Sequence, residues 1–561
     1  MRLPEYGSGS SLTIQYCDNP VWYCISSLPA MTVPGNNSIF SLLYSYYGTA
    51  LTSGIMRDYP AIAESLSSWT EGKSATPLDS RLSADSLLKL YPLDATIWVN
   101  NARSSELRSM QLSRYLDKDA AASSLKEISG RLALLRNSDG GFSWCPGMES
   151  SLFASEGVVR MAGMLYRRGY LGKDSEMYRL AASAIDYCDS VWMSYYRHDG
   201  KNFDLLSLVP YLYVRSAFGI QPKARGFSAL KAKSLDALQR SWRELAPYRA
   251  AEAAVLLYGE KRVSVPRAII KSLSEKAMHS DEKGMWFDNI VSSYSEFPAL
   301  LTTAKVLEAF AAVDPASPCV EEMRQWLLLQ KQVQDWGDSR NTAEVVYALL
   351  SSGADWTAAS PAPVITLDGM ELVPESKEAS TGAFVMNLDP VKASGAMLRI
   401  EKEGAAPSWG GVMSQRVAPV SEVRPASVPS LSISKRIYRL DGSEASAGDL
   451  KVGDKVRVTL TVVNSDNMDY VAISDLRPAC LQPIDQLSGY TGADGLYFYR
   501  ETGKKSTDIF ISYLPKGTHQ ITYDCFVTFA GTYSSGTATA QSQYYPMITA
   551  HSAGEMLTVE P

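Results

Sequence analysis

One pattern occurs three times between residues 134 and 350 of the chain. Each copy has an apolar helix-like segment, a turn with glycine and an aromatic residue, and a second helix-like segment with an early glutamate. The copies are LLRNSDGGFSW (134–144) before FASEGVVRMAGML (153–165), EKGMWFDN (282–289) before YSEFPALLTTAKVLEAF (294–310), and LLLQKQVQDWG (327–337) before NTAEVVYALL (341–350). Repeated helical hairpins form an open solenoid or a closed ring. Because neither end carries a polar capping repeat, we expect a closed α/α toroid.

The periodicity changes along the chain and divides it into regions. Apolar residues recur at helical spacing from about residue 17 to 355. Short alternating segments follow, up to about Pro425, and a linker rich in proline and serine (419–430) comes next. From Leu431 about seven longer segments alternate at period two, which predicts an antiparallel β-sandwich. The fold class expected is multidomain α + β.

Composition excludes several classes of function. The chain of 561 residues has a formal net charge of −6, so no basic face for nucleic acid or anionic membrane is indicated. No apolar run is long enough to span a bilayer, and the start, MRLPEYGSGSSLT, lacks the apolar region of a signal peptide. That abrupt start suggests a piece of a longer protein.

Cysteine and histidine patterns predict no metal or cofactor site. The seven cysteines form no CxxC pair, and we expect mainly buried free thiols. The four histidines are far apart and have no metal-ligand spacing. We therefore predict no catalytic, cofactor-binding or metal-binding residues.

Carboxylates were considered for glycosidase chemistry, which some helical toroids support. The candidates are Glu149, Glu156, Asp288, Glu296 and Glu344. A glycosidase needs two carboxylates held across a cleft, but these glutamates fall where first helical turns are expected, and the helix dipole favours them there. A serine or threonine just before Glu156 and Glu344 fits an N-terminal cap. Asp139, before Gly140 and Gly141, is interpreted as a turn residue.

Several segments together resemble the C-terminal part of the bacterial alpha-2-macroglobulins. They are NPVWYCISSLPAM (19–31), SYYGTAL (45–51), LRNSDGGFSW, WLLLQKQVQDWGDSRNTAEVVYALL (326–350), APSWGGVMSQ (406–415) and LKVGDKVRVTLTVVNSDNMDYVAISDLRPACLQP (450–483), with the strands up to Pro546. The resemblance implies four parts: the end of the first half of a CUB-like β domain (1–16), a thioester-type toroid (17–358), the second half of the CUB-like domain (359–425) and a terminal macroglobulin-like sandwich (426–561).

The sequence departs from the family at its reactive motif. Members that bind proteases covalently carry Cys-x-Glu-Gln, whose Cys and Gln side chains close a thioester. Alignment through Tyr46 and Tyr47 places that motif at Ser38, Ile39, Phe40 and Ser41, and no Cys, Glu or Gln lies between Met31 and Tyr47. The nearest thiol in the preceding sequence, Cys24, lies beyond two prolines. We predict no thioester.

The resemblance also implies a contact for the vacated position. Aromatic residues of the terminal domain shield the thioester in bacterial members, and Tyr544 and Tyr545 match them by position. We expect Tyr544 and Tyr545 to make an ordinary interdomain contact, with Ile39 and Phe40 packing against the sandwich.

The function implied is inhibition of endopeptidases by non-covalent trapping, with no enzymatic activity. The partners would be target proteases, recognised through a bait region upstream of this chain. The location would be the periplasm, the cell envelope or the exterior, with lipid anchoring of the full-length protein as an option. Two alternatives stay open: a cell-envelope scaffold or adhesion protein on the same fold, and a toroidal enzyme that acts on polysaccharide.

Overall fold

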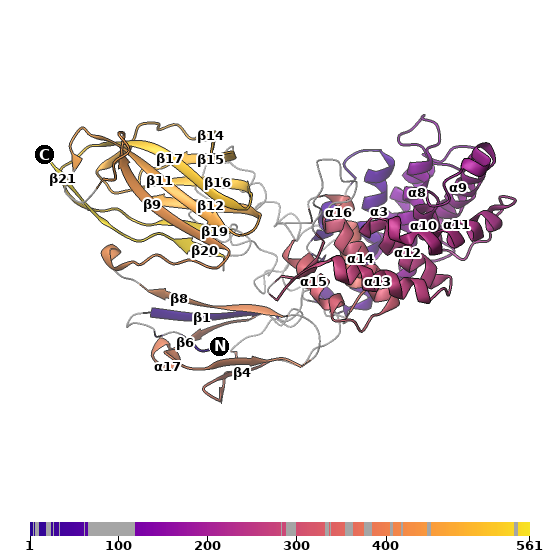
Figure 1. The fold of residues 1–561 in the computed structure, drawn as a ribbon, viewed down its shortest axis with the longest axis horizontal. Coiled ribbons are helices and arrows are strands. Elements are labelled where there is room, and N and C mark those ends of the chain that lie inside the picture. The colour runs from indigo at the N-terminus through magenta and orange to yellow at the C-terminus, as the bar shows by residue number, and fades with distance from the viewer. Residues whose placement is uncertain are drawn as a thin grey trace.

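The structure is a computed structural model of the chain. It describes residues 1–3, 5, 10–17, 24–25, 27–32, 34–60, 62–64, 118–281, 283–287, 299–330, 336, 338–353, 363–374, 384–403, 408–416, 419–445, 450–542 and 548–561. Figure 1 shows a group of helices, two small sheets, one of which contains the N-terminal strand, and a larger β-sandwich.

Among the described residues, six helices form the inner layer of the ring. They are α3 (Ile39–Asp58), α8 (Leu152–Arg167), α10 (Val209–Arg215), α12 (Pro247–Gly259), α14 (Ala299–Val313) and α16 (Ser339–Leu350). Each helix contacts the next, and α16 contacts α3, so the ring closes. Its buried side chains form one continuous apolar core. The expected toroid of helical hairpins is therefore confirmed.

The outer layer packs against these inner helices. It comprises α7 (Lys118–Ala133), α9 (Glu176–Asp199), α11 (Phe227–Ser241), α13 (Ser264–Lys276) and α15 (Cys319–Leu329). A short helix, α2 (Pro29–Thr32), packs on α3. A hairpin of β2 (Met278–Ser280) and β3 (Gly284–Trp286) lies beside α15.

All three copies of the sequence repeat share one hydrogen bond between the turn and the following helix. In each unit, the backbone N–H of the turn aromatic donates to a serine or threonine side chain of the following inner helix. The pairs are Phe142 with Ser155 (2.9 Å), Phe287 with Thr303 (3.3 Å) and Trp336 with Thr342 (3.2 Å). All three aromatic rings are buried. The bond joins each turn to the helix that follows.

Capping differs from our expectation for two of these helices. Ser155 and Thr342 lie inside α8 and α16, whereas Ser151 and Asp338 are the N-caps and accept from the N–H groups of Ala154 and Asn341. The capping interpretation was wrong because Ser155 and Thr342 already accept the hydrogen bonds from the preceding turns.

The first strand is completed by strands that follow the ring in sequence. β1 (Ser10–Cys17) pairs antiparallel with β6 (Phe384–Leu388) on one side and β8 (Trp409–Arg416) on the other. A second sheet contains β4 (Val364–Leu367), β5 (Met370–Glu371) and β7 (Leu398–Glu401), and α17 (Pro390–Ala393) lies beside β1. The two sheets share one small apolar core.

The C-terminal region is a sandwich of two main sheets. One has the order β13 (Leu481–Pro483), β17 (Gly517–Val527), β11 (Lys455–Asn464) and β9 (Leu431–Arg439). The other runs β14 (Gly489–Ala493), β15 (Leu496–Thr502), β16 (Ser506–Leu514), β12 (Met468–Leu476), β19 (Ala538–Ser542) and β20 (Thr549–His551). Alternate residues of β9, β11 and β17 are buried between the sheets.

A third, smaller sheet closes one end of the sandwich. It consists of β10 (Leu450–Lys451), β21 (Met556–Glu560) and β18 (Gly531–Ser534). The seven long strands that we predicted are present, and the region contains further short strands that we did not predict.

The ring and the sandwich are in contact. Lys283, in the turn between β2 and β3, forms an ion pair with Asp466, which lies between β11 and β12.

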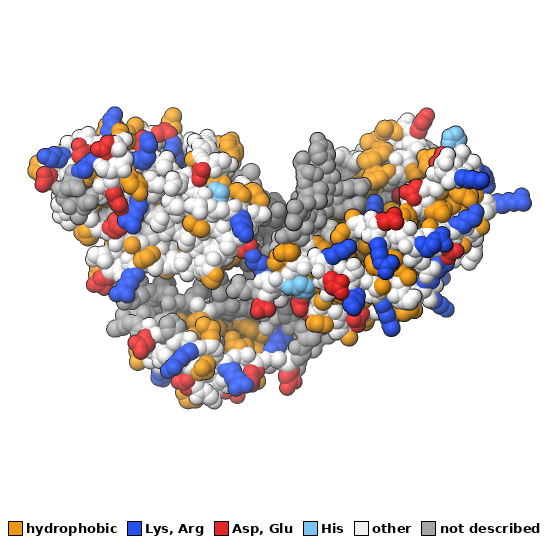
Figure 2. Space-filling model, in the orientation of Figure 1, with side chains coloured by type: hydrophobic (Ala, Val, Ile, Leu, Met, Phe, Trp, Pro, Cys, Tyr) orange, Lys and Arg blue, Asp and Glu red, His pale blue; other side chains and the backbone are white. Residues whose placement is uncertain are grey.

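The surface and the cysteines match the composition. Figure 2 shows basic and acidic side chains interspersed over the ring and the sandwich, as the small net charge predicts. Six cysteines with described side chains carry free thiols: Cys24, Cys188, Cys480 and Cys525 are buried, Cys319 is half-buried, and Cys145 is exposed. In the described ranges, no helix combines the length and hydropathy needed to cross a membrane.

Candidate functional site

The position aligned with the thioester motif lies at the N-terminus of α3. Ser38 is the N-cap residue and Ile39 begins the helix. The Asn36 side-chain oxygen accepts from the Ser38 N–H (2.9 Å) and the Ser38 hydroxyl (2.6 Å), and the Ser41 hydroxyl accepts from the Asn36 N–H (3.3 Å). Both serine hydroxyls therefore stabilise the turn that enters the helix.

Ile39 and Phe40 both pack within the ring. Ile39 is fully buried in the ring's own core, and its N–H donates to the Trp144 carbonyl (2.9 Å). Ile39 therefore contributes to the core of the ring, and the contact with the sandwich that we expected for it stays a prediction.

Phe40 belongs to an aromatic cluster that also contains Trp144 and Phe153. The Phe40 ring centroid lies 5.2 Å from that of Trp144 and 5.4 Å from that of Phe153, while Trp144 and Phe153 stack at 5.6 Å. Gly157 makes room for Phe40, because a Cβ there would lie 2.7 Å from the ring. Trp144 and Phe153 remain 41% and 60% exposed, so the cluster presents an apolar patch beside the start of α3.

The residues near this cluster give a mixed outcome for the sequence predictions. Cys24 is buried in the ring core. The exposed Cys145, which follows Trp144 in the same turn, is a neighbour that sequence alignment did not identify. Tyr544 and Tyr545 lie outside the described residues, so their contact stays a prediction.

Asp139 has the predicted turn role. Its carboxylate accepts from the Gly141 N–H (3.0 Å), and Gly140 has a φ of +85°.

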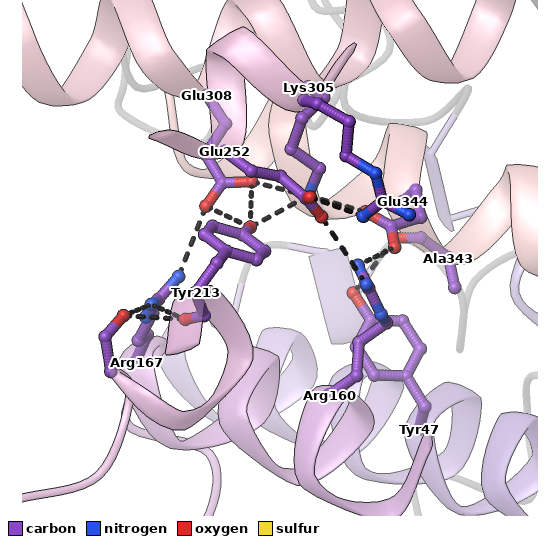
Figure 3. Close-up of polar contacts among 11 residues, drawn as sticks. Tyr47, Arg160, Arg167, Tyr213, Glu252, Lys305, Glu308, Ala343 and Glu344 are labelled. Atoms are coloured by element: carbon purple, nitrogen blue, oxygen red, sulfur yellow. Dashed lines mark hydrogen bonds and ion pairs between the residues drawn. The ribbon is translucent and has the colours of Figure 1, made fainter. Parts of the chain in front are cut away.

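The ring interior contains a second polar arrangement, a buried ion network (Figure 3). Lys305 of α14 is at its centre. Its ammonium donates to the Tyr213 hydroxyl (2.8 Å), the Glu308 carboxylate (2.8 Å) and the Glu344 carboxylate (2.9 Å). Four residues from α10, α14 and α16 are thus joined at one nitrogen, and all four are at most 9% exposed.

Two arginines of α8 extend this ion network. Arg160 pairs with Glu344 (3.1 Å) and Glu252 of α12 (3.5 Å), and Arg167 pairs with Glu308 (3.2 Å). Nearby, the Tyr47 hydroxyl donates to the Ala343 carbonyl (3.3 Å) and joins α3 to α16. The contacts therefore bridge all six inner helices, from α3 through α16.

Charge pairing explains how these groups remain buried. Arg160, Arg167 and Lys305 face the carboxylates of Glu252, Glu308 and Glu344, and Arg249 also pairs with Glu252 (2.7 Å), so every one of these carboxylates has a cationic partner. Buried charges are tolerated only when they are paired and hydrogen-bonded. Burial raises the pKa of the Glu344 carboxyl, but the charges of Lys305 and Arg160 outweigh it and lower that pKa to about 2.

The carboxylates considered for glycosidase chemistry are not gathered into one described site. Glu149 is exposed, Glu156 accepts from the Trp192 indole N–H (2.9 Å), and Glu344 belongs to the ion network. Asp288 and Glu296 lie outside the described residues. The first-turn interpretation was wrong for Glu156 and Glu344, since α8 and α16 have no acidic residue in their first turns. The ion pairs of Glu344 favour a structural role.

Comparisons with known proteins identify the sandwich. The family model described as the bacterial alpha-2-macroglobulin MG10 domain matches residues 431–546. This range runs from the first residue of β9 to the segment after β19. The resemblance to the C-terminal part of the bacterial alpha-2-macroglobulins is thus confirmed over this domain. Among the curated proteins, none matches the chain.

Solved structures of the same proteins also align with the chain. Salmonella alpha-2-macroglobulin reacted with methylamine is 14% identical, with a TM-score of 0.36 over 100% of this chain and 33% of its own. Trypsin-activated Escherichia coli alpha-2-macroglobulin is 14% identical, with a TM-score of 0.45 over 100% of this chain and 35% of its own. The Escherichia coli protein activated by porcine elastase is 16% identical, with a TM-score of 0.42 over 100% of this chain and 45% of its own. The chain spans less than half the length of these proteins, and at such TM-scores the alignments carry no further argument.

Proposed function

We propose that this chain, whose sandwich matches the bacterial alpha-2-macroglobulin MG10 domain, is the C-terminal part of a family member that lacks the thioester and retains proteases without a covalent bond. The observation that carries the proposal is the structure of residues 38–41 at the start of α3. Ser38 and Ser41 stabilise a turn there, Ile39 is buried, and Phe40 packs in the aromatic cluster.

Thioester chemistry requires groups that this position lacks. The acyl bond joins a cysteine thiol to the side-chain carbonyl carbon of glutamine, and neither residue type occurs between Met31 and Tyr47. A serine hydroxyl is a weak nucleophile unless a neighbouring base activates it. The Ser38 hydroxyl instead donates to the Asn36 amide oxygen, which supports a structural role for it.

The aromatic cluster has a role in this proposal as an interdomain surface. Trp144 and Phe153 are large apolar side chains left partly in water, and such patches mark contact sites in soluble proteins. Tyr544 and Tyr545 of the terminal domain are the proposed partners of this surface. The division of the chain at residues 16, 358 and 425 belongs to the same proposal, and the pairing of β1 with β6 and β8 supports a β domain that the ring interrupts.

The wider setting follows from the family relationship. Two of the related structures are of alpha-2-macroglobulins activated by trypsin and by porcine elastase. By analogy, target proteases are the proposed partners of the full-length protein, which they would cut at a bait region upstream of this chain. We place that protein in the periplasm or cell envelope, with lipid anchoring as an option, and assign it no enzymatic activity.

A substrate-size assay tests the trapping function. The full-length protein is mixed with trypsin or elastase, and cleavage of a large protein substrate is compared with cleavage of a small peptide substrate. Physical enclosure predicts loss of cleavage of the large substrate and retention of cleavage of the small one. The 561-residue chain alone should block neither. Unchanged cleavage of the large substrate by the full-length mixture would contradict trapping.

A scaffold or adhesion role in the cell envelope is the second candidate. The exposure of Trp144 and Phe153 favours it, because an apolar patch without reactive chemistry can bind another protein of the envelope. The two candidates separate in the same assay, since a scaffold leaves protease activity toward both substrates unchanged. A polysaccharide-active enzyme is less favoured, because Glu252, Glu308 and Glu344 of the ring interior are all held by cations.

A further inference from the structure

The interior of the sandwich holds a lysine and an aspartate in direct contact. Lys435 lies on β9 of the four-stranded sheet and Asp475 on β12 of the six-stranded sheet, so they meet across the core. The Lys435 Nζ is 2.6 Å from the Asp475 Oδ1, and the side chains are 5% and 0% exposed. This burial in the core isolates the pair from water.

The Lys435 Nζ has three oxygen neighbours, two backbone carbonyls and the Asp475 carboxyl group. The Nζ donates to the carbonyls of Leu476 (2.8 Å) and Ser535 (2.8 Å). The third oxygen near the Nζ is the Asp475 Oδ1, at 2.6 Å. A neutral amine has two N–H groups and one lone pair. With two positions of the Nζ directed at carbonyls, the third faces Asp475, and it carries an N–H in the ammonium and the lone pair in the neutral amine.

The surroundings favour the neutral form of the Asp475 carboxyl group. The strand neighbours are apolar in part: Lys435 is opposite Leu460 on β11, and Asp475 is opposite Ala538 on β19. Isolated charges are costly in such an interior. Burial raises the pKa of the Asp475 carboxyl above its ordinary value, although the positive charge of Lys435 opposes the shift. Transfer of one proton from Nζ to Oδ1 converts the ion pair into an amine and a carboxylic acid.

A hydroxyl group is positioned at the other carboxyl oxygen. Tyr523 of β17 donates to the Asp475 Oδ2. Burial and the neighbouring Asp475 raise the pKa of Tyr523 well above its ordinary value, so its hydroxyl remains a donor. A donor fixed at this oxygen stabilises the negative charge that develops there when the carbonyl carbon is attacked.

From this geometry we propose that Lys435 and Asp475 form an intramolecular amide bond that joins the two sheets of the sandwich. The Lys435 nitrogen attacks the Asp475 Cγ, and the developing charge on Oδ2 is held by the Tyr523 hydroxyl. The nitrogen then gives up a proton to Oδ1, the bond from Cγ to Oδ1 breaks, and Oδ1 leaves as water. One amide and one water form from one amine and one carboxylic acid, so no oxidant, reductant or cofactor is needed.

The bond would fix β9 to β12 and close the chain segment between them. Such a cross-link restricts the unfolded chain as a disulfide does, and it cannot be reduced. A sandwich without a disulfide among its described residues would gain a covalent connection in this way. The proposal is independent of protease trapping.

Intact mass spectrometry of the denatured 561-residue chain tests the proposal. The expected mass is that of the sequence less one water, and a protease digest should yield one branched peptide that contains Lys435 and Asp475. A mass equal to that of the sequence would overturn the proposal. A water loss located at other residues would also overturn it.

Three variants, each checked for folding by circular dichroism, locate the chemistry. Lys435→Arg keeps a cation but removes the amine, so its mass should equal that of its sequence. Tyr523→Phe should give a lower cross-linked fraction soon after synthesis. Lys455→Arg changes an exposed lysine on the neighbouring strand β11 and should lose one water as the unchanged chain does. A water loss at Asp475 that persists in Lys435→Arg would contradict the assignment.

Discussion

The ammonium group of Lys305 lies 2.9 Å from the carboxylate of Glu344, and this ion pair connects two inner helices of the ring. Both side chains are 3% exposed. The same ammonium also contacts Glu308 and Tyr213, so one lysine compensates two buried carboxylates. The ring is therefore held by charge at its centre as well as by its apolar core.

Replacement of Lys305 by methionine should strongly destabilise the ring. The change leaves Glu308 and Glu344 with less compensating charge, and loss of one partner of a buried pair costs about 3–5 kcal/mol in the free energy of unfolding. Urea denaturation measures the loss. Lys231→Met is the matched control, because the pair of Lys231 with Glu260 is about 30% exposed and contributes only ~0–1 kcal/mol. Equal effects of the two changes would contradict the central role of Lys305.

Acid should weaken the ring through Glu344. Its pKa is lowered in the folded chain from 4.5 to about 2, so its contribution to stability is complete above pH 4.5 and is lost as the pH falls toward 2. The contribution is on the order of 3 kcal/mol. Urea denaturation at several pH values between 6 and 2.5 should give a smaller pH dependence for Glu344→Gln than for the unchanged chain. An identical pH dependence would show that Glu344 is not ionised in the folded ring.

The close packing of the Phe40 ring on Gly157 predicts that alanine at residue 157 destabilises the helix domain. Alanine in place of glycine inside a helix normally stabilises by about 0.5–1 kcal/mol. Gly157→Ala should instead destabilise by about 1–3 kcal/mol, because its Cβ would lie 2.7 Å from the Phe40 ring. Gly130→Ala in α7, with no atom within 4 Å of its Cβ, is the control and should stabilise.

A double variant completes this test by thermal denaturation. Phe40→Leu shortens the side chain, so Gly157→Ala should cost less in that background than in the unchanged chain. Strictly additive effects would show that Phe40 and Gly157 do not contact each other.

The repeated bond between turn and helix predicts a common effect at its acceptors. Thr342→Val removes the acceptor for the buried N–H of Trp336 and should cost about 1–3 kcal/mol in the free energy of unfolding. Ser155→Ala removes the acceptor for the N–H of Phe142 and should have a similar cost in the free energy of unfolding. The control is Ser190→Ala, because that exposed hydroxyl donates only to a carbonyl of its own helix. Chemical denaturation compares the three, and a cost at Ser190 equal to the others would contradict the prediction.

Long, periodic elements could be predicted from the sequence, and contacts between distant positions could not. The repeat around Phe142 and Trp336 indicated the ring because each copy has the same order of turn, aromatic residue and helix. The ion network could not be anticipated, since Arg160 and Glu344 are 184 positions apart and no motif links them. In the sandwich, β10 and β13 are too short to show alternation, which explains the underestimated number of strands.

The placement of the vacated thioester site at residues 38–41 stays a prediction, and the surroundings of these residues were not foreseen. The structure shows that α3 begins at Ile39. The partners of Phe40 could not be read from the sequence, because Trp144 and Phe153 approach it only when α3 and α8 pack side by side. A substitution at Phe40 therefore reports on the ring as well as on any contact with the sandwich.

Capture of a protease by the full-length protein is the most direct test of the account. The protein is incubated with trypsin, and the mixture is divided between native size-exclusion chromatography and denaturing electrophoresis. The account predicts that trypsin elutes with the protein under native conditions and separates from it completely in denaturant, because residues 38–41 hold neither Cys nor Gln. Trypsin that stays attached in denaturant would contradict the absence of a covalent bond, and trypsin that never co-elutes would contradict trapping.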